Sequence, residues 1–108
     1  MYYNDKNDLK QLAEMKELAP EGFSAWWNLD QLVGREDGAI PRKYRELIAI
    51  AVAHTTQCPY CIDVHAAAAK EVGATKQEVT EAIFLAAALR SSAAAVHGTM
   101  AMRAYDKA

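Results

Sequence analysis

The chain has few of the features that would assign it to a class at once. Its 108 residues include only two Phe, two Trp, three Pro and two Cys, and its formal charge is -2. The 12 basic and 14 acidic residues are mixed along the chain and form no basic stripe, so nucleic-acid binding is excluded as an interpretation. Uninterrupted apolar runs are short, and the one at Leu47–Ala53 falls far below the ~20 residues of a membrane-spanning helix. We therefore expect no membrane association.

The first ten residues, MYYNDKNDLK, are polar and lack the apolar stretch of a signal peptide, which predicts a cytoplasmic protein. A disulfide between Cys58 and Cys61 would close a very small loop, so it would add little stability. In a reducing compartment such a closely spaced pair is more often catalytic or metal-binding than structural.

Alanine is abundant where aromatic residues are scarce, with 22 alanines in the chain. The length fits a single domain over residues 1–108. Alanine side chains allow close helix packing but contribute little buried area each, so the core is expected to be thin. The composition therefore favours a homo-oligomer.

The spacing of apolar residues predicts an all-α fold with about five to six helices and no strands. The expected helices cover about 5–19, Pro20 to Gly34, Pro41 to the residues before Cys58, Cys58 to Gly73, and Thr75 to about 105. Residues 35–40 form the clearest loop, and Thr75 with Glu78 has the spacing of a capping box. Either Ser91-Ser92 or Gly98 is a candidate break in the last helix. The third helix is apolar on all sides from Leu47 to Val52, which predicts that it is buried.

The richest chemistry lies in the segment from Cys58 to His65. With Cys58 at the N-cap and Pro59 at the first helical position, both sulfurs fall in the first turn, where unpaired amides favour a thiolate. Cys58, Cys61 and His65 lie within about 60° of one another on a helical wheel. His65 follows Cys61 by one turn, so it can accept the thiol proton and activate the sulfur as a nucleophile.

Glu46 is the fourth candidate site residue. If the third and fourth helices form an antiparallel hairpin, His65 lies about 10 Å down one arm from the turn and Glu46 about 12 Å down the other. The hairpin therefore predicts that Glu46 lies beside His65 rather than beside Cys58. A carboxylate there can hold the imidazole in one tautomer and support its proton transfer.

Other interpretations of these residues stay open. The cysteines could be a buried pair without chemistry, and Glu46 could be a solvated acid at a helix start. Zinc could bind Cys58, Cys61, His65 and Glu46, although one helical turn rarely closes a tetrahedral site and structural zinc favours more sulfur. Two histidines and two tryptophans lack any partner for chemistry, and we expect them to serve packing, a surface or a subunit interface: His54, His97, Trp26 and Trp27.

The tetrapeptide Cys58-Pro59-Tyr60-Cys61 also occurs in glutaredoxins, but the strand before it and the later proline of that fold are missing. The wider spacing of Glu46, Cys58, Cys61 and His65 resembles the signature of the AhpD-like alkylhydroperoxidases, within the carboxymuconolactone decarboxylase superfamily. The resemblance covers about residues 41–103 and includes the helix from Arg42 to Ile48 and the alanine-rich stretch after Thr75.

The resemblance implies a helical subunit of a trimer or hexamer, and a thiol peroxidase that needs no cofactor or metal. It implies that Cys61 is the peroxidatic thiol, Cys58 the resolving thiol, His65 the base and Glu46 part of the proton relay. Tyr60 stands where some of these enzymes carry a histidine, which removes one proton carrier. Decarboxylases of the superfamily generally lack the cysteine pair.

The sequence thus predicts a peroxidase that reduces small organic hydroperoxides through a dithiol–disulfide cycle. The resemblance implies an external dithiol reductant, either a lipoylated protein or a thioredoxin-type donor. Two alternatives remain: a lactone decarboxylase or isomerase of the same superfamily, and a non-catalytic protein that responds to redox state or metal.

Overall fold

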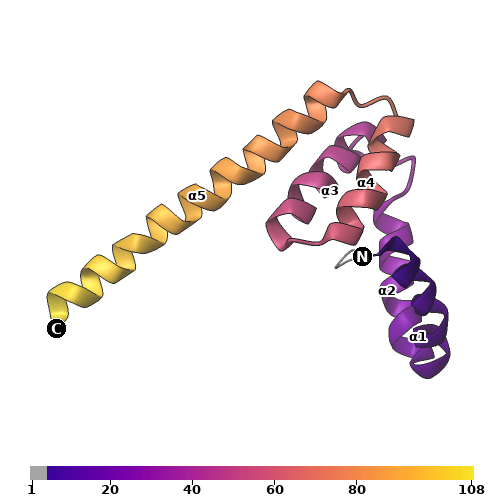
Figure 1. Ribbon diagram of the computed structural model, residues 1–108, viewed down its shortest axis with the longest axis horizontal. Coiled ribbons are helices and arrows are strands. Elements are labelled where there is room, and N and C mark those ends of the chain that lie inside the picture. Colours follow the sequence, from indigo (N-terminus) through magenta and orange to yellow (C-terminus); the bar gives the residue numbers. More distant parts are fainter. Residues whose placement is uncertain (1–4) are drawn as a thin grey trace.

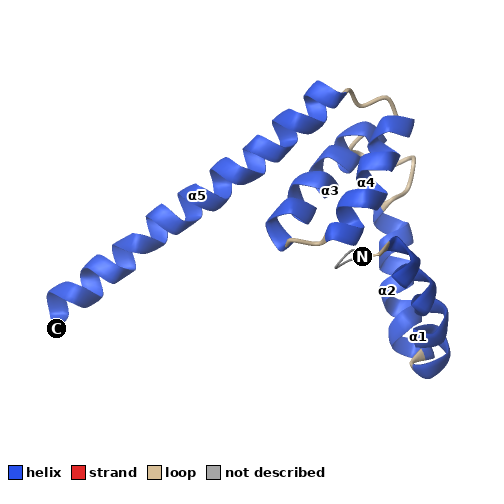
Figure 2. Cartoon of the chain, in the orientation of Figure 1, coloured by secondary structure: helices blue, strands red, loops and turns tan. Residues whose placement is uncertain are grey.

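A computed structural model describes residues 5–108, and this part of the chain contains helices and no strands (Figures 1 and 2). A 3-10 helix, η1, covers Lys6–Gln11 and precedes five α-helices. These are α1 (Leu12–Leu18), α2 (Pro20–Val33), α3 (Arg42–Thr56), α4 (Pro59–Glu71) and α5 (Lys76–Lys107). The predicted all-α class is confirmed.

The N-terminal helices α1 and α2 pack against each other beside the rest of the chain. The single helix expected over 5–19 is instead η1 followed by α1, with Asp5 capping the start through the backbone N–H of Asn7. Pro20 occupies the first turn of α2 as predicted, and the helix ends at Val33 immediately before Gly34. On α2, the Phe23 ring lies 5.5 Å from that of Trp26 and 6.0 Å from that of Trp27, centroid to centroid.

Helices α3 and α4 form the antiparallel hairpin that the sequence predicts (Figure 1). Gln57 makes the sharp turn between them in the left-handed region at φ 57°, and Cys58 caps α4. The centre of the hairpin holds Ile50, Ala53 and Ala69, which are all at most 3% exposed. The expectation that α3 is buried all round is wrong for the chain itself, because Ile48 and Val52 line cavities and are about half exposed.

Helix α5 is a single unbroken element of 32 residues, so neither proposed break occurs. Alanine and other good helix formers predominate along α5, and their summed helix propensity outweighs the cost of one Gly, which is about 1 kcal/mol. Its predicted capping box is present: Thr75 accepts the backbone N–H of Glu78, and Glu78 accepts that of Thr75. By length and composition alone, α5 also meets the criterion for a membrane span, which core helices of soluble proteins satisfy equally.

The first half of α5 packs on α3, whereas its C-terminal end projects far from the N-terminal helices (Figure 1). Lys43 of α3 pairs with Glu78 at 2.8 Å, and Arg90 donates to the terminal carbonyls of α3. The radius of gyration is 18.0 Å, whereas a compact domain of this length has one of about 13 Å. The chain is therefore extended, and α3 and α4 supply most of its small core.

Candidate active site

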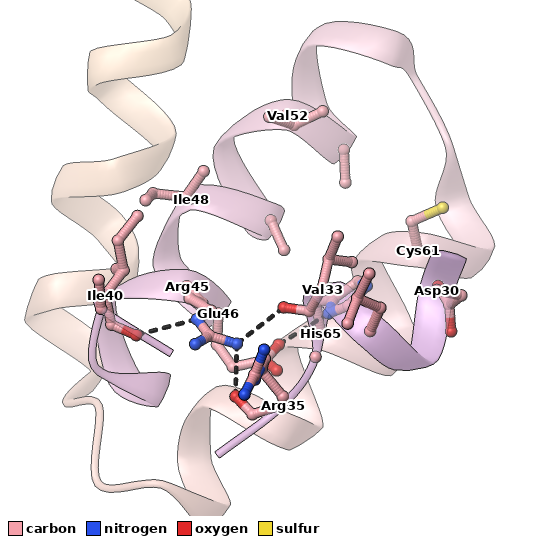
Figure 3. Close-up of a pocket in the computed structure, with 15 residues that line it drawn as sticks. Asp30, Val33, Arg35, Ile40, Arg45, Glu46, Ile48, Val52, Cys61 and His65 are labelled. Carbon is pink, nitrogen blue, oxygen red and sulfur yellow. Dashed lines mark hydrogen bonds and ion pairs between the residues drawn. The ribbon is translucent and has the colours of Figure 1, made fainter. Parts of the chain in front are cut away.

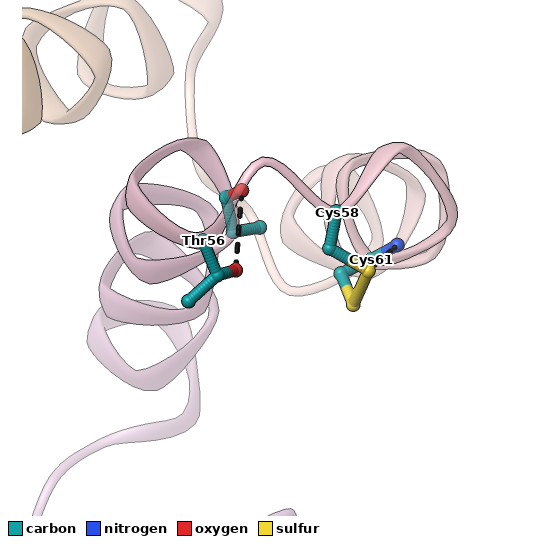
Figure 4. Close-up of a disulfide and its surroundings, with 4 residues drawn as sticks. Thr56, Cys58 and Cys61 are labelled. Carbon is teal, nitrogen blue, oxygen red and sulfur yellow. Dashed lines mark hydrogen bonds between the residues drawn. A yellow bond between two sulfur atoms is a disulfide. The ribbon is translucent and has the colours of Figure 1, made fainter.

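The cysteine pair occupies the first turn of α4 as predicted (Figure 4). Cys58 is the N-cap, and its Sγ accepts the backbone N–H of Cys61 at 3.2 Å. The two sulfurs are joined in a disulfide across a Cα–Cα distance of 5.3 Å. The same helix end that forms this bond can stabilise a thiolate on Cys58 once the pair is reduced, because its free amides carry partial positive charge.

Glu46 of α3 and His65 of α4 meet across the hairpin. His65 Nδ1 lies 2.7 Å from Oε2 of Glu46, whose side chain is only 6% exposed. The proximity expected from the hairpin register is therefore present, whereas the catalytic roles of the two residues stay predictions. Buried carboxylates need partners, and His65 supplies one of them.

Arg42 supplies the second partner of Glu46, one helical turn earlier on α3. Its Nε donates to Oε1 of Glu46 at 2.8 Å, and its Nη1 donates to Glu36 at the same distance. Burial raises the pKa of Glu46, but hydrogen bonds from His65 and Arg42 outweigh this effect, so the net pKa lies below its ordinary value. Sequence reasoning did not single out Arg42, although its i,i+4 spacing to Glu46 is a recognisable signal.

A cavity of about 640 Å³ opens beside these groups (Figure 3). Cys61 and His65 contribute to its wall from α4, and Glu46 contributes from α3. Cys58 is not among its lining residues. Most of the remaining wall is apolar and comes from the end of α2, the following loop and α3: Leu32, Val33, Ala39, Ile40, Ile48, Ala49, Val52 and Ala53.

Arg45 fixes the loop that forms one side of this cavity. Its guanidinium donates to the carbonyls of Val33, Arg35 and Ile40 (Figure 3). Gly38 lies so close to the guanidinium that any Cβ at this position would overlap it. The cavity wall therefore depends on residues from three segments, and no local sequence pattern predicts it.

The other expected surface or packing residues lie apart from this cavity. His54 contacts the carbonyl of Ile50 through Nδ1 at 2.8 Å, and His97 is exposed on α5. Trp26 and Trp27 are 46% and 43% exposed. Within residues 5–108, no group of three or more His, Cys, Asp or Glu side chains is arranged to hold a metal ion.

Tyr60, between the two cysteines, is directed toward the N-terminal helices. Its hydroxyl donates to Asp8 at 2.8 Å, and this hydrogen bond raises the pKa of Tyr60 above its ordinary value. A phenol bound in this way is a weaker acid than a free tyrosine. Tyr60 is therefore poorly suited to donate a proton to the neighbouring cysteines.

Residues 20–104 match the carboxymuconolactone decarboxylase family. The chain belongs to this family. The match covers the cavity, the cysteine pair and nearly all of α5, and it agrees with the resemblance found in the sequence. The presence of a Cys-x-x-Cys motif in a member of this family is consistent with a thiol-based enzyme.

A crystal structure of an apo carboxymuconolactone decarboxylase family protein from Legionella pneumophila superposes with a TM-score of 0.69. It is 34% identical and the match covers 78% of this chain and 74% of that one. An uncharacterized protein of the cox locus of Paracoccus denitrificans is 45% identical over 71 residues, and the uncharacterized YdfG of Bacillus subtilis is 32% identical over the same length. Each of these two matches covers 66% of the present chain. They cover only 64% of the Paracoccus protein and 47% of YdfG, so the chain spans less than two thirds of the length of either relative.

Proposed function

We propose that the protein is a thiol-dependent peroxidase that reduces small organic hydroperoxides. The observation that carries the proposal is the joint position of Cys61 and His65 on one cavity, with His65 hydrogen-bonded to the buried Glu46. A thiol, a base and a carboxylate that orients the base form the arrangement of an activated nucleophile.

In the proposed first step, His65 accepts the proton of the Cys61 thiol, and the thiolate attacks the terminal oxygen of the hydroperoxide. An S–O bond forms and the O–O bond breaks, so Cys61 becomes a sulfenic acid. The departing alkoxide takes the proton from His65 and leaves as an alcohol. The imidazole returns to its neutral form.

In the proposed second step, the Cys58 thiol gives up its proton and the resulting thiolate attacks the sulfenic sulfur of Cys61. The S–S bond forms, the S–O bond breaks, and the leaving hydroxide takes up the proton that Cys58 lost and departs as water. An external dithiol then reduces the disulfide by exchange and is itself oxidised to a disulfide. We propose a lipoylated protein or a thioredoxin-type protein as this donor.

The mostly apolar cavity wall supports an alkyl or aryl hydroperoxide as the substrate. Ile48 and Val52 of α3 offer contact to a hydrocarbon group while the peroxide reaches Cys61. No nucleic acid or membrane takes part in this scheme. We propose the cytoplasm as its compartment, because a dithiol cycle needs a reducing environment.

The extended shape supports a homo-oligomer, for which the family resemblance suggests a trimer or hexamer. The accessible surface of the chain is 8734 Å², whereas a compact monomer of its mass exposes only about 5,900 Å². The excess of about 2,800 Å² is in the range that obligate interfaces bury. The exposed apolar surface of α5 includes Leu89, Val96 and Met100, which are all more than half exposed.

The chemistry can be tested by treating the reduced protein with a small excess of cumene hydroperoxide and measuring intact and peptide masses. The wild type should lose two hydrogens as a Cys58–Cys61 disulfide. Cys58→Ser should accumulate one sulfenic acid on Cys61, and Cys61→Ser should not consume peroxide.

Thiols that stay reduced under peroxide, or normal peroxide consumption by Cys61→Ser, would contradict the proposal. Turnover of a lactone that survives loss of both thiols would indicate the decarboxylase or isomerase alternative. Stoichiometric oxidation with no turnover under any dithiol would indicate a redox-responsive binding protein instead.

A further inference from the structure

We infer that Arg42 is a positioning residue of this site: it holds Glu46 as a carboxylate, and Glu46 in turn holds His65 in the tautomer that can accept a proton from Cys61. The inference deepens the proposed function and rests on it for the role of Cys61. Thiolate formation can be measured without peroxide, so the role of Arg42 and the peroxidase activity can fail separately.

The geometry places Glu46 between a permanent cation and the imidazole. Its Oε1 accepts from Arg42 Nε at 2.8 Å, and its Oε2 lies 2.7 Å from His65 Nδ1. The side chain of Glu46 is 6% exposed, whereas those of Arg42 and His65 are 27% and 34% exposed. The two carboxylate oxygens therefore have separate partners, and one of these partners cannot lose its charge.

The permanent charge of Arg42 decides the protonation state of its neighbours. An arginine is always protonated in proteins, so a hydrogen-bonded carboxylate beside it is favoured as the anion. An ionised carboxylate only accepts hydrogen bonds. The Nδ1 of His65 must therefore carry the proton in its contact with Glu46, which leaves Nε2 of the neutral ring free to accept one.

This arrangement assigns different tasks to Glu46 and His65. Arg42 opposes proton transfer to Glu46, because a neutral Glu46 would leave the guanidinium without its buried partner. The proton of the Cys61 thiol consequently stays on the imidazole, and Glu46 stabilises the imidazolium through its charge. Glu46 is then an orienting residue and not a link through which the proton moves.

Glu36 extends the same chain of contacts toward solvent. It pairs with Arg42 Nη1 at 2.8 Å, and its side chain is 78% exposed. Because it is solvated, its charge is screened and only weakly offsets that of Arg42 at Glu46. The other ionisable groups around this site come from α2, the loop, α3 and α4, and they are Asp30, Arg35, Arg45 and Cys61.

The experiment measures how fast iodoacetamide alkylates Cys61 as a function of pH, in the reduced full-length Cys58→Ser protein. Without Arg42, the buried Glu46 takes up a proton more easily, so it stabilises less well the imidazolium that forms when His65 accepts the Cys61 proton. Arg42→Gln should therefore move the midpoint of the alkylation profile to higher pH. A shift of about half to one pH unit slows alkylation roughly 3- to 10-fold below the midpoint.

Two further variants separate positioning from folding. Arg42→Lys keeps the charge, so its midpoint should stay close to that of the parent protein. In a Glu46→Gln background the route from Arg42 to His65 is broken, and Arg42→Gln should add no further shift. The double variant has no buried carboxylate without a partner. It can therefore still be measured if the Arg42→Gln single variant fails to fold.

The inference is overturned if Arg42→Gln folds and leaves the midpoint unchanged, or if it shifts the midpoint equally with and without Glu46. A midpoint that moves equally in Arg42→Lys and Arg42→Gln also contradicts it, because charge would then be irrelevant. If alkylation behaves as expected but peroxide leaves Cys61 unoxidised, Arg42 positions the thiol site and the peroxidase proposal fails.

Discussion

The α3–α4 hairpin and helix α5 have similar alanine-rich sequences but differ in how many of their side chains are buried within the chain. The hairpin buries Ile50, Ala53 and Ala69 at its centre and holds Glu46 between two partners. In α5, only Ala86 is buried, although the helix is 32 residues long. Local helix signals therefore suffice to form both elements, whereas only the hairpin makes enough contacts within the chain to bury a core.

The difference assigns distinct roles to the two regions. The hairpin contains every sequence-predicted site residue and most of the side chains that are buried within the chain. The C-terminal half of α5 presents an apolar stripe that continues the face packed on α3, formed by Leu89, Ala93, Val96 and Met100. We propose that other copies of the chain cover this stripe.

The largest effect is expected from charges placed on the stripe. Val96→Glu combined with Met100→Glu should reduce the oligomer to a species near the 11.9 kDa of one chain, because carboxylates are costly to bury in an apolar interface. Light scattering coupled to size-exclusion chromatography gives this mass. The matched control is Ala94→Glu with Ala101→Glu on other sides of α5, and an equal loss of mass there would reject the stripe as the interface.

A cavity in the hairpin core should have the next largest effect. Ile50 is 1% exposed, so Ile50→Ala should lower the free energy of unfolding by about 2–5 kcal/mol. Ile48 lies on the same helix but is 51% exposed, and Ile48→Ala should cost much less. Urea unfolding at two protein concentrations measures both, and equal losses at the two positions would show that the hairpin lacks the core described.

The ion pairs of Glu46 predict how the hairpin responds to acid. Because its pKa is lower in the folded protein than the unfolded value of about 4.3, its ionisation stabilises the fold above that pH and the effect is lost as pH falls through the folded pKa. At pH 7, Glu46→Gln should cost about 1–3 kcal/mol. The difference from the wild type should shrink below about pH 4.3.

Urea midpoints of the two proteins between pH 7 and pH 3 test this dependence. A matched control is Glu81→Gln, because Glu81 is exposed on α5. A stability difference for Glu46→Gln that stays constant across this range would mean that its charge does not contribute.

The smallest effect concerns the start of α5. Thr75→Ala removes one half of the capping box and should cost about 1 kcal/mol. Thr80 is the matched control, because its hydroxyl donates only to the carbonyl of Lys76 within the helix. Hydrogen exchange of the first turn should accelerate in Thr75→Ala and not in Thr80→Ala. Similar exchange in both would indicate that packing on α3, rather than the cap, fixes this end.

Residue types that act locally allowed much of the hairpin to be predicted. Pro41 and Pro59 mark helix starts. The number of residues from Cys58 back to Glu46 and on to His65 fixes which side chains meet once the two helices are antiparallel. The single helix expected over 5–19 is instead the 3-10 helix η1 followed by α1. The choice between 3-10 and α geometry at η1 depends on contacts that the periodicity of apolar residues does not describe.

The remaining features depend on tertiary contacts or on the sum of many weak preferences. Gly98 lies inside α5 without breaking it, since one unfavourable residue is outweighed by its neighbours. Arg42 is recognisable as a partner of Glu46 by spacing, but its importance follows only from the burial of that carboxylate. The cavity needs Arg45 to hold the loop after α2, a contact across 12 residues that no local pattern indicates.

If the hairpin activates Cys61 through His65, the rate of a single oxidation step should depend on that imidazole. We would follow formation of the Cys61 sulfenic acid by cumene hydroperoxide in Cys58→Ser, with and without His65→Asn, and with His97→Asn on α5 as the control. Loss of a general base should slow the reaction by roughly 10²- to 10⁴-fold, and His97→Asn should leave the rate unchanged. Equal rates with and without the His65 imidazole would show that it does not activate Cys61.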